Sequence, residues 1–352
     1  MSLRATEGTR FTLLVRMAID VCQQAERECP RTGPGRKPEI PDWVMAVLIM
    51  VALAKRKKTK AAQYRFLKEH VKTLMRLLPN QRFPSRSTYY ERYRRIGRLY
   101  QVAIHLQGAT AVKKGWAAAE VVAVDKSLIA ARGPVWHRHR RRSRGADPEA
   151  GWGRSEHDGW VFGYSFEIVV SCGKTGVLWP LLASADRANC SECRSFPEKI
   201  PFLPTTTRYV LADRGYDADV HCEAIEWKTA GRRSGCRFVC PTIERYNARR
   251  PRQQAWKRSL HRQVRHAHRT ERKTFLQTPL GKSLYARRAV AVEPFNSWFK
   301  TLFELEDRVW HRGLENNRTQ LLASVLLYQL LLRVNRACGE HNGRIKWIID
   351  AL

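Results

Sequence analysis

The sequence predicts an α/β fold, with a helical N-terminal region, a mixed β-sheet flanked by helices, and a C-terminal helix. Over roughly the first hundred residues, apolar positions recur at mixed three- and four-residue spacing, which is typical of helices. From Val121 the pattern changes to alternating and continuous apolar runs bounded by Gly and Pro, which is typical of strands. A chain of 352 residues exceeds the size at which single cores usually stop growing, so we expect two or three structural units.

The N-terminal region is predicted to be a set of short helices. An apolar helix follows Pro41-Asp42, and the next helical pattern ends at Pro79-Asn80. After Pro84, Thr88 and Glu91 have the spacing of a capping box, which predicts a further helix with a basic face. Such a helix pair is compatible with a helix-turn-helix that reads DNA bases and equally with a helical bundle whose basic face is solvated.

Apolar runs predict the sheet. A helix over 217–229 lies between the last two predicted strands, so it can cross over between them and some of the sheet should be parallel. The predicted strands are Ala119 to Val124, Trp160 to Ser171, Val177 to Ser184, Thr207 to Ala212 and Arg237 to Cys240.

Two basic segments interrupt this region, and a last apolar helix is predicted over 315–336. The first segment is an arginine-rich loop over 132–144, and the second, over 245–273, contains eleven Lys or Arg but one acid, with apolar residues at helical spacing. We expect both segments to track DNA phosphate rather than only to solvate the surface. The candidate DNA-binding side chains are Arg138, Arg140, Arg141, Arg142, Arg249, Arg250, Arg262 and Arg265.

Charge indicates the partner. The chain has 64 basic and 32 acidic residues, a net charge of +32, which suits a polyanion whose counterions are released on binding. A membrane surface would also attract this charge, but the longest apolar run, over 43–54, is far shorter than the roughly 18–20 residues that a bilayer span needs. The first residues lack the apolar core of a secretion signal, so we expect a cytoplasmic protein that does not use a membrane.

The nine cysteines do not form a disulfide pattern. Their number is odd and their spacing irregular, which favours a reducing compartment. Cys190 and Cys193 have the spacing of a zinc-binding pair that Cys236 and Cys240 can complete. Small residues in a strand explain the second pair more simply, so zinc stays an open alternative.

Three acids that lie far apart in the sequence are the candidate catalytic residues. Asp125 and Asp213 each follow an apolar strand, and ligands gather at the carboxyl ends of strands in open α/β sheets. Glu293 lies on a predicted helix, on the same face as Asn296, Ser297 and Lys300 and opposite the apolar Val292, Phe295, Phe299 and Leu302. Carboxylates of this kind can hold two Mg²⁺ ions for phosphoryl transfer. Taken singly, each is explained as well by a turn, a helix cap or a solvated charge.

The residues around these acids resemble a known family. Leu211-Ala212-Asp213-Arg214-Gly215-Tyr216-Asp217 and Val292-Glu293-Pro294-Phe295 are similar to the second- and third-acid motifs of the DDE transposases of bacterial insertion sequences, and Trp160-Val161-Phe162-Gly163-Tyr164 is similar to their hairpin strand. Within that family, Tyr285, Arg287 or Arg288, Glu293 and Lys300 match a Tyr-Arg-Glu-Lys signature. The interval from Glu293 to Lys300 is that of the signature, but the spacing upstream of Glu293 differs from the signature by about one residue. The sequence alone therefore does not show which of the two arginines fills the role.

The resemblance covers roughly residues 121–332 and implies an RNase H-like catalytic core, which we expect over about 119–310 with a basic insert at about 241–284. The first hundred residues match no motif of the family. There we expect a helical DNA-binding and dimerisation region over 1–118, and after the core a helical region over 311–352. The resemblance also implies that Asp125, Asp213 and Glu293 are catalytic and bind two Mg²⁺ or Mn²⁺ ions, and that Tyr285, the arginine and Lys300 contact the DNA end. The implied activity is cut-and-paste transposition: a homodimer cleaves terminal inverted repeats and joins their 3′ ends to double-stranded target DNA, with no organic cofactor, in bacterial cytoplasm and on the nucleoid.

Alternatives differ in their chemistry. An RNase H-like nuclease without strand joining, and a catalytically silent nucleic-acid-binding protein, both account for the charge. Trp136, Trp152 and Trp160 could stack an unpaired base, although core burial explains any one of them as well.

Overall fold

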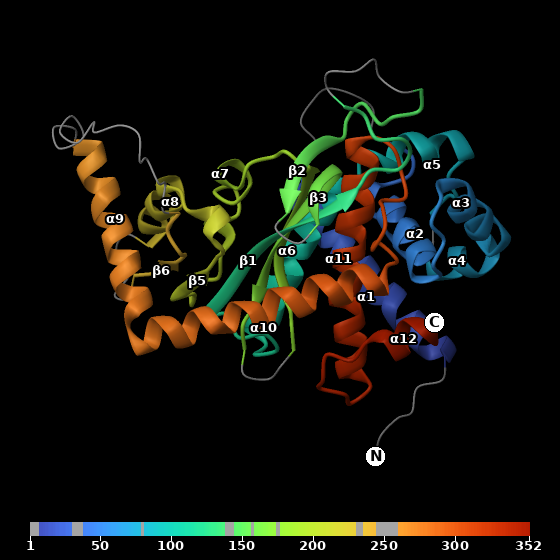
Figure 1. The fold of residues 1–352 in the computed structure, drawn as a ribbon. Helices are drawn as coiled ribbons and strands as arrows, with labels where there is room; N and C mark the ends of the chain where they lie inside the picture. The colour runs from blue at the N-terminus through green and yellow to red at the C-terminus, as the bar shows by residue number, and fades with distance from the viewer. Residues whose placement is uncertain are drawn as a thin grey trace.

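A computed structural model describes residues 7–29, 38–78, 81–137, 144–155, 158–173, 177–229, 235–243 and 260–352. Figure 1 shows a central sheet, a lobe of N-terminal helices on one side of it, and a long helix that runs beneath it to an upright helix at the far end. The architecture is α/β, as the sequence predicts.

The N-terminal helices form a lobe around one fully buried helix. The residues of α2 from Trp43 to Ala54 are all buried, which confirms that the longest apolar run is a core helix. No helix within the described ranges combines the length and apolarity needed to cross a bilayer. The lobe comprises α1 (Glu7–Glu28), α2 (Asp42–Ala54), α3 (Lys60–Glu69), α4 (Val71–Leu77), α5 (Arg86–Tyr93) and α6 (Gly97–Lys113).

The N-cap of helix α5 lies three residues before the predicted capping box. The Ser85 side chain accepts a hydrogen bond from the Thr88 backbone N–H, so Ser85 is the N-cap and the prediction of a cap at Thr88 is wrong. Both residues can cap a helix, and Ser85 takes the role because it directly follows Pro84, at the residue where the chain leaves its extended conformation.

The sheet is mixed. The long strand β3 pairs antiparallel with β1, β2 and β4, whereas β5 runs parallel to β1, and β6 parallel to β5. Helix α8 (Asp219–Thr229) crosses over between the last two strands, which confirms the predicted parallel pairing. The mixed sheet with helices packed against it is as the sequence predicts. Its strands are β1 (Val121–Ala130), β2 (Gly151–Ser155), β3 (Gly159–Ser171), β4 (Pro180–Arg187), β5 (Tyr209–Leu211) and β6 (Arg237–Val239).

Strand β1 is longer than its apolar run. The run ends at Val124, but β1 continues to Ala130 because residues Asp125 to Ala130 pair with Ile168 to Gly163 of β3. Asp125 therefore lies within a strand and not at its end, which corrects the prediction. Strand β2, which pairs with the first part of β3, was not predicted.

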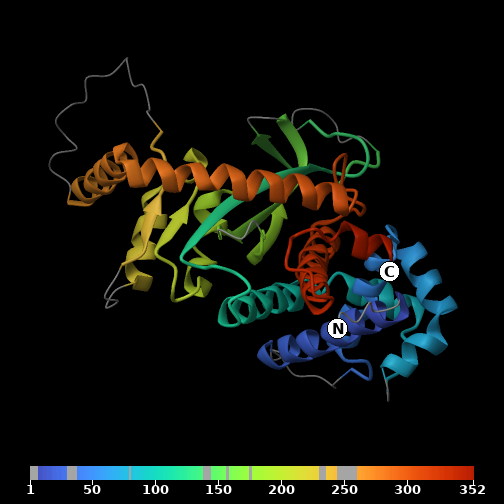
Figure 2. The ribbon, with the colours of Figure 1, turned by 90° about the horizontal axis from the view of Figure 1, so that it is seen from below.

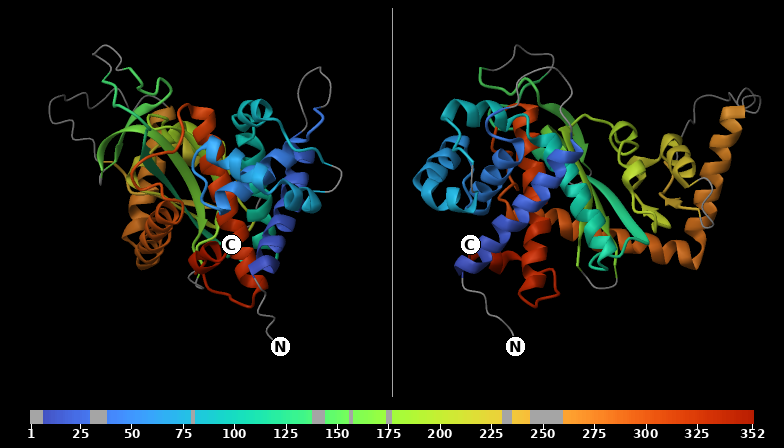
Figure 3. Two further views of the ribbon diagram at one scale, coloured as in Figure 1. Left: turned by 90° about the vertical axis from the view of Figure 1, so that its right-hand side faces the viewer. Right: turned by 180° about the vertical axis from the view of Figure 1, so that it is seen from behind.

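Two long helices organise the rest of the chain. Helix α10 contacts β1, β3 and β5, and Figure 2 shows it crossing the sheet from α9 to the helical lobe. Helix α11 packs against α1, α2 and α6 and also against β3 and β4, so it joins the lobe to the sheet (Figure 3). The remaining elements are α7 (Glu192–Ser195), η1 (Ile200–Phe202), η2 (Arg214–Tyr216), α9 (Leu260–Gln277), α10 (Pro279–Leu302), α11 (Leu314–Ala337) and α12 (Lys346–Asp350).

Candidate active site

Two of the three predicted acids lie side by side: Asp125 within β1, and Asp213 two residues after the end of the neighbouring strand β5. In the parallel pair β1–β5, Ala123 is paired with Leu211, so Asp125 and Asp213 are each two residues beyond the same paired position. Neighbouring strands are about 4.8 Å apart, which places the two aspartates at adjacent points of the sheet. Asp213 also caps the 3-10 helix η2, because its Oδ1 accepts a hydrogen bond from the Gly215 N–H at 2.8 Å.

Arg288 of α10 bridges this acid pair. Its Nη2 lies 2.7 Å from Asp125 Oδ1 and 3.7 Å from Asp213 Oδ2. The neighbouring Arg287 points elsewhere and donates to the Cys172 carbonyl. The structure thus distinguishes the two arginines that the sequence leaves equivalent: Arg288 faces the acids and Arg287 does not.

Asn296, two turns further along α10, holds the other oxygen of Asp125. Its Nδ2 donates to Asp125 Oδ2 at 2.7 Å. Its Oδ1 and the Arg288 Nε are both buried without a hydrogen-bond partner among the described residues. An unpartnered buried acceptor is costly, so Asn296 leaves a hard oxygen donor available beside the acid pair.

Burial and charge shift the pKa values at this site. Burial, together with the charge of Asp213, raises the pKa of Asp125 to about 6 even though Arg288 opposes the shift. Burial also raises the pKa of Asp213. For Arg288, burial alone would lower the pKa, but the two aspartates outweigh burial and the net shift is upward. The two carboxylates therefore concentrate negative charge where a cation neutralises it.

Glu293 does not join the pair. It is exposed on α10, and among the described residues no three His, Cys, Asp or Glu side chains gather closely enough to hold a metal ion. Three residues on a helix turn through about 300°, so Glu293 points some 60° away from Asn296, the residue that reaches Asp125. The oxygen donors that are assembled come from Asp125, Asp213 and Asn296. Their chemistry fits a hard divalent cation, which prefers carboxylate and amide oxygens.

The other two signature residues lie near the acids. Tyr285 is half-buried one turn before Arg288, and burial raises the pKa of its hydroxyl. The Lys300 Nζ donates to the Leu128 carbonyl of β1 at 3.1 Å. Burial lowers the pKa of Lys300, and the charges of Asp158 and Asp125 oppose that shift. The side of α10 that faces β1 is therefore cationic on both flanks of Asn296.

Comparison with known proteins decides the family. A family model described as "Transposase DDE domain" matches residues 116–330, which is more than half of the chain. This chain belongs to the transposase DDE family. No curated protein sequence matches it. A solved structure with some likeness is the cryo-EM structure of a piggyBac transposase synaptic complex with hairpin DNA, which is 9% identical, with a TM-score of 0.42 over 99% of this chain and 79% of that one.

A buried polar network supports the second aspartate of the transposase. Glu167 of β3 is 3% exposed and accepts hydrogen bonds from Lys199, from Ser195 at 2.9 Å and from the Tyr216 hydroxyl at 2.9 Å. Tyr216 lies three residues after Asp213, so this network fixes the turn that carries the aspartate. Glu167 was not predicted as a site residue, although a single acid within an apolar strand is a signal visible in the sequence.

The structure places some of the remaining candidate residues and does not describe others. Trp152 is packed, since it donates to the Trp136 carbonyl and contacts Phe162, whereas Trp160 is 66% exposed. Cys240, one of the four cysteines of the alternative zinc site, donates to the Asp213 carbonyl. Arg262 and Arg265 lie in α9 with side chains outside the described set, and Arg138, Arg140, Arg141, Arg142, Arg249 and Arg250 lie outside the described residues altogether.

Proposed function

We propose that this transposase binds the terminal inverted repeats of an insertion sequence, cleaves the DNA in a reaction that depends on divalent metal, and joins the 3′ ends to target DNA. The observation that carries the proposal is the bridge from Arg288 to Asp125 and Asp213. Two partly buried carboxylates side by side are costly unless a cation is bound between them. The Arg288 guanidinium lies against both carboxylates.

Asp125 and Asp213 are the proposed ligands of Mg²⁺ or Mn²⁺, with Glu293 as the third acid and two ions in the full site. The metal supplies polarisation of the phosphate and activation of the attacking oxygen when it is bound. The chain's own residues position the DNA: Tyr285, Arg288 and Lys300 line the side of α10 that faces β1, and each can donate a hydrogen bond to phosphate oxygens.

Glu293 requires a local change in α10 to reach the pair. Pro294 follows it directly inside the helix, and proline has no N–H to donate to the Val290 carbonyl. The helix is therefore weakest where the change is needed. We propose that Arg288 would pair with a DNA phosphate in place of the carboxylates in the complex with DNA, which would free the space beside Asp125.

We propose that the chain consists of three consecutive functional regions. The helical region over 1–118 would bind and dimerise on DNA, the core over 119–310 with its insert at about 241–284 would cleave, and 311–352 would complete the helical lobe. A homodimer would hold two element ends. A bacterial cytoplasmic protein associated with the nucleoid fits this role.

Asp213→Asn tests the chemistry. Asparagine keeps an oxygen that can accept the Gly215 N–H, so the turn should stay folded while the charge is lost. We expect DNA binding within twofold of the wild type and no Mg²⁺-dependent nicking of the element's own end sequences. The matched control is Asp307→Asn, which changes an exposed acid and should leave nicking intact. Unchanged nicking by Asp213→Asn would contradict the proposal.

Two readouts separate the alternatives. Covalent joining of a labelled 3′ end to a plasmid distinguishes transposition from simple nuclease activity. Glu293→Gln should abolish nicking without changing the melting temperature, because Glu293 is exposed. If both acid variants nick normally, other residues carry the catalysis and the assignment of the acids is wrong. If the wild type binds the end sequences but does not nick them with Mg²⁺ or Mn²⁺, the chain is a nucleic-acid-binding protein and not an enzyme.

A further inference from the structure

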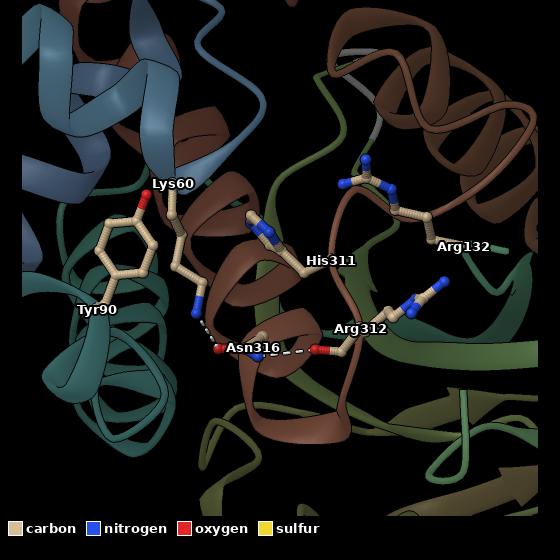
Figure 4. A pocket seen from close by; sticks show the side chains of 6 residues that line it. All are labelled: Lys60, Tyr90, Arg132, His311, Arg312 and Asn316. Carbon is tan, nitrogen blue, oxygen red and sulfur yellow. Dashed lines mark hydrogen bonds between the residues drawn. The ribbon is translucent and has the colours of Figure 1, made fainter. Parts of the chain in front are cut away.

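A cationic pocket of about 410 Å³ lies away from the acid pair, between the helical lobe and the sheet. Lys60 and Tyr90 come from the N-terminal helices, Arg132 follows β1, and His311, Arg312 and Asn316 come from the start of α11 and the loop before it (Figure 4). Three basic side chains thus meet from three distant parts of the sequence, and no acid lines the pocket.

The basic side chains are held in place but not neutralised. Lys60 Nζ donates to Asn316 Oδ1 at 2.8 Å, and Arg132 Nη1 donates to the Trp310 carbonyl at 2.9 Å. Among the residues that the structure describes, no carboxylate lies within 4.0 Å of the charged groups of Lys60, Arg132 or Arg312. Unpaired like charges repel one another, so this arrangement is most favourable when an anion is bound.

Two glycines next to the pocket leave room for the Arg312 side chain. Gly133 and Gly145 have φ of +103° and +89°, and a Cβ on either would lie 3.1 Å from Arg312 Nη2. These glycines accommodate both the left-handed backbone and the guanidinium. The position of Arg312 is therefore built into the fold.

His311, which lines the pocket, is buried, and the positive charges near it affect its pKa. Burial, together with the charges of Lys60 and Arg132, lowers the pKa of His311 to about 3. His311 Nε2 lies 3.1 Å from the Tyr93 hydroxyl, so the ring is a fixed neutral wall and not a ligand.

We propose that this pocket binds a phosphate group of the DNA backbone. A base is a poorer occupant, because the Tyr90 ring already carries Lys60 at 5.6 Å and Arg86 at 5.4 Å from its centroid and has little free face for stacking. Charged nitrogens around a water-accessible space suit the oxygens of a phosphate, which accept several charge-assisted hydrogen bonds.

The pocket is within reach of DNA bound at the active site. Arg132 is seven residues beyond Asp125 along β1 and the segment that follows it, a span of about 23 Å at most, whereas one turn of the double helix is about 34–36 Å. Lys300, at the Leu128 carbonyl, lies between them. A phosphate in the pocket would clamp the helical lobe to the same duplex that the acids cleave, so the inference rests on DNA being the substrate.

The test measures DNA binding in EDTA, where cleavage plays no part. Anisotropy of a labelled duplex of arbitrary sequence is recorded over a range of salt concentrations for Arg132→Gln/Arg312→Gln. Loss of one phosphate contact should make the slope of log Kobs against log salt shallower by about 0.9. The charge-retaining pair Arg132→Lys/Arg312→Lys should keep the wild-type slope. The matched control Lys113→Gln/Arg344→Gln removes the same charge from exposed sites elsewhere and should also keep it.

The outcomes are distinct. An unchanged slope in the glutamine pair, or an equal change in the control pair, overturns the proposal. If the glutamine pair melts at a lower temperature, Arg312→Gln alone is the second variant, since its side chain is exposed. In a second experiment, inorganic phosphate is titrated into the wild type and the glutamine pair, with chloride at equal ionic strength as the control. If phosphate raises the melting temperature of the wild type only, while the two proteins have the same salt slope for DNA, the pocket binds free phosphate and the proposal of a DNA phosphate is overturned. Because Asp213→Asn is scored by nicking, failure of the proposed catalysis leaves this result unaffected.

Discussion

Replacing Arg288 by methionine tests whether a guanidinium stands where metal would bind. Methionine keeps most of the volume and removes the charge. Arg288 and Asp125 are 14% and 15% exposed and 2.7 Å apart, and a hydrogen bond to a charged group of this kind contributes about 1.5–3 kcal/mol. Spread over 352 residues that unfold together, a loss of this size lowers the melting temperature by about 2–4 °C.

In Arg288→Met, bound Mg²⁺ should restore the lost thermal stability. In the wild type, the cation and Arg288 compete for Asp125 Oδ1, so removing Arg288 should strengthen metal binding by the free energy of the lost contact. At 1.4 kcal/mol for each factor of ten, this corresponds to roughly 10- to 150-fold less Mg²⁺ at half-maximal stabilisation. Thermal unfolding is followed during Mg²⁺ titration at constant ionic strength, starting from EDTA-treated protein.

Arg287→Met is the control. It removes the same charge from the adjacent position, but Arg287 contacts the Cys172 carbonyl and not the acids. Its Mg²⁺ titration should match the wild type. Equal responses of the two methionine variants to Mg²⁺, or an Arg288→Met variant that needs as much Mg²⁺ as the wild type, would show that Arg288 does not compete with the cation for Asp125.

Two other predictions concern stability. His311 has a pKa of about 3 in the folded chain and about 6.5 when unfolded, so the unfolded chain binds more protons between these values and stability falls as pH drops through that range. From pH 7 to pH 5 the wild type should lose about 2 kcal/mol more than His311→Gln in urea unfolding, and parallel pH profiles would contradict this. A Cβ at Gly108 would lie 2.4 Å from the Leu181 carbonyl oxygen, so Gly108→Ala should cost about 1–3 kcal/mol by forcing α6 away from β4. Gly8→Ala, with nothing within 4 Å of its Cβ, should not lower the melting temperature.

Local pattern predicted much of the fold because periodicity reports which side of an element is buried. The buried face of α10, formed by Val292, Phe295, Phe299 and Leu302, is as predicted, and so is the burial of α2. The parallel pairing of β5 and β6 followed from the helix between them. The polar continuation of β1 past Val124 was not predictable, because its stability comes from pairing with β3 some forty residues later.

Local features of the sequence indicated a polyanionic partner and metal-dependent phosphoryl transfer for this transposase: its charge, the aspartates Asp125 and Asp213 after apolar runs, and the helix that carries Glu293 and Lys300. Tertiary structure alone decided which side chains meet. Arg288 and not Arg287, and Asn296 and not Glu293, reach Asp125, because a difference of one to three residues on a helix changes the direction of a side chain by about 60–100°. The pocket of Lys60, Arg132 and Arg312 depends on the same fact, since residues so far apart in the chain meet only when the lobe packs on the sheet.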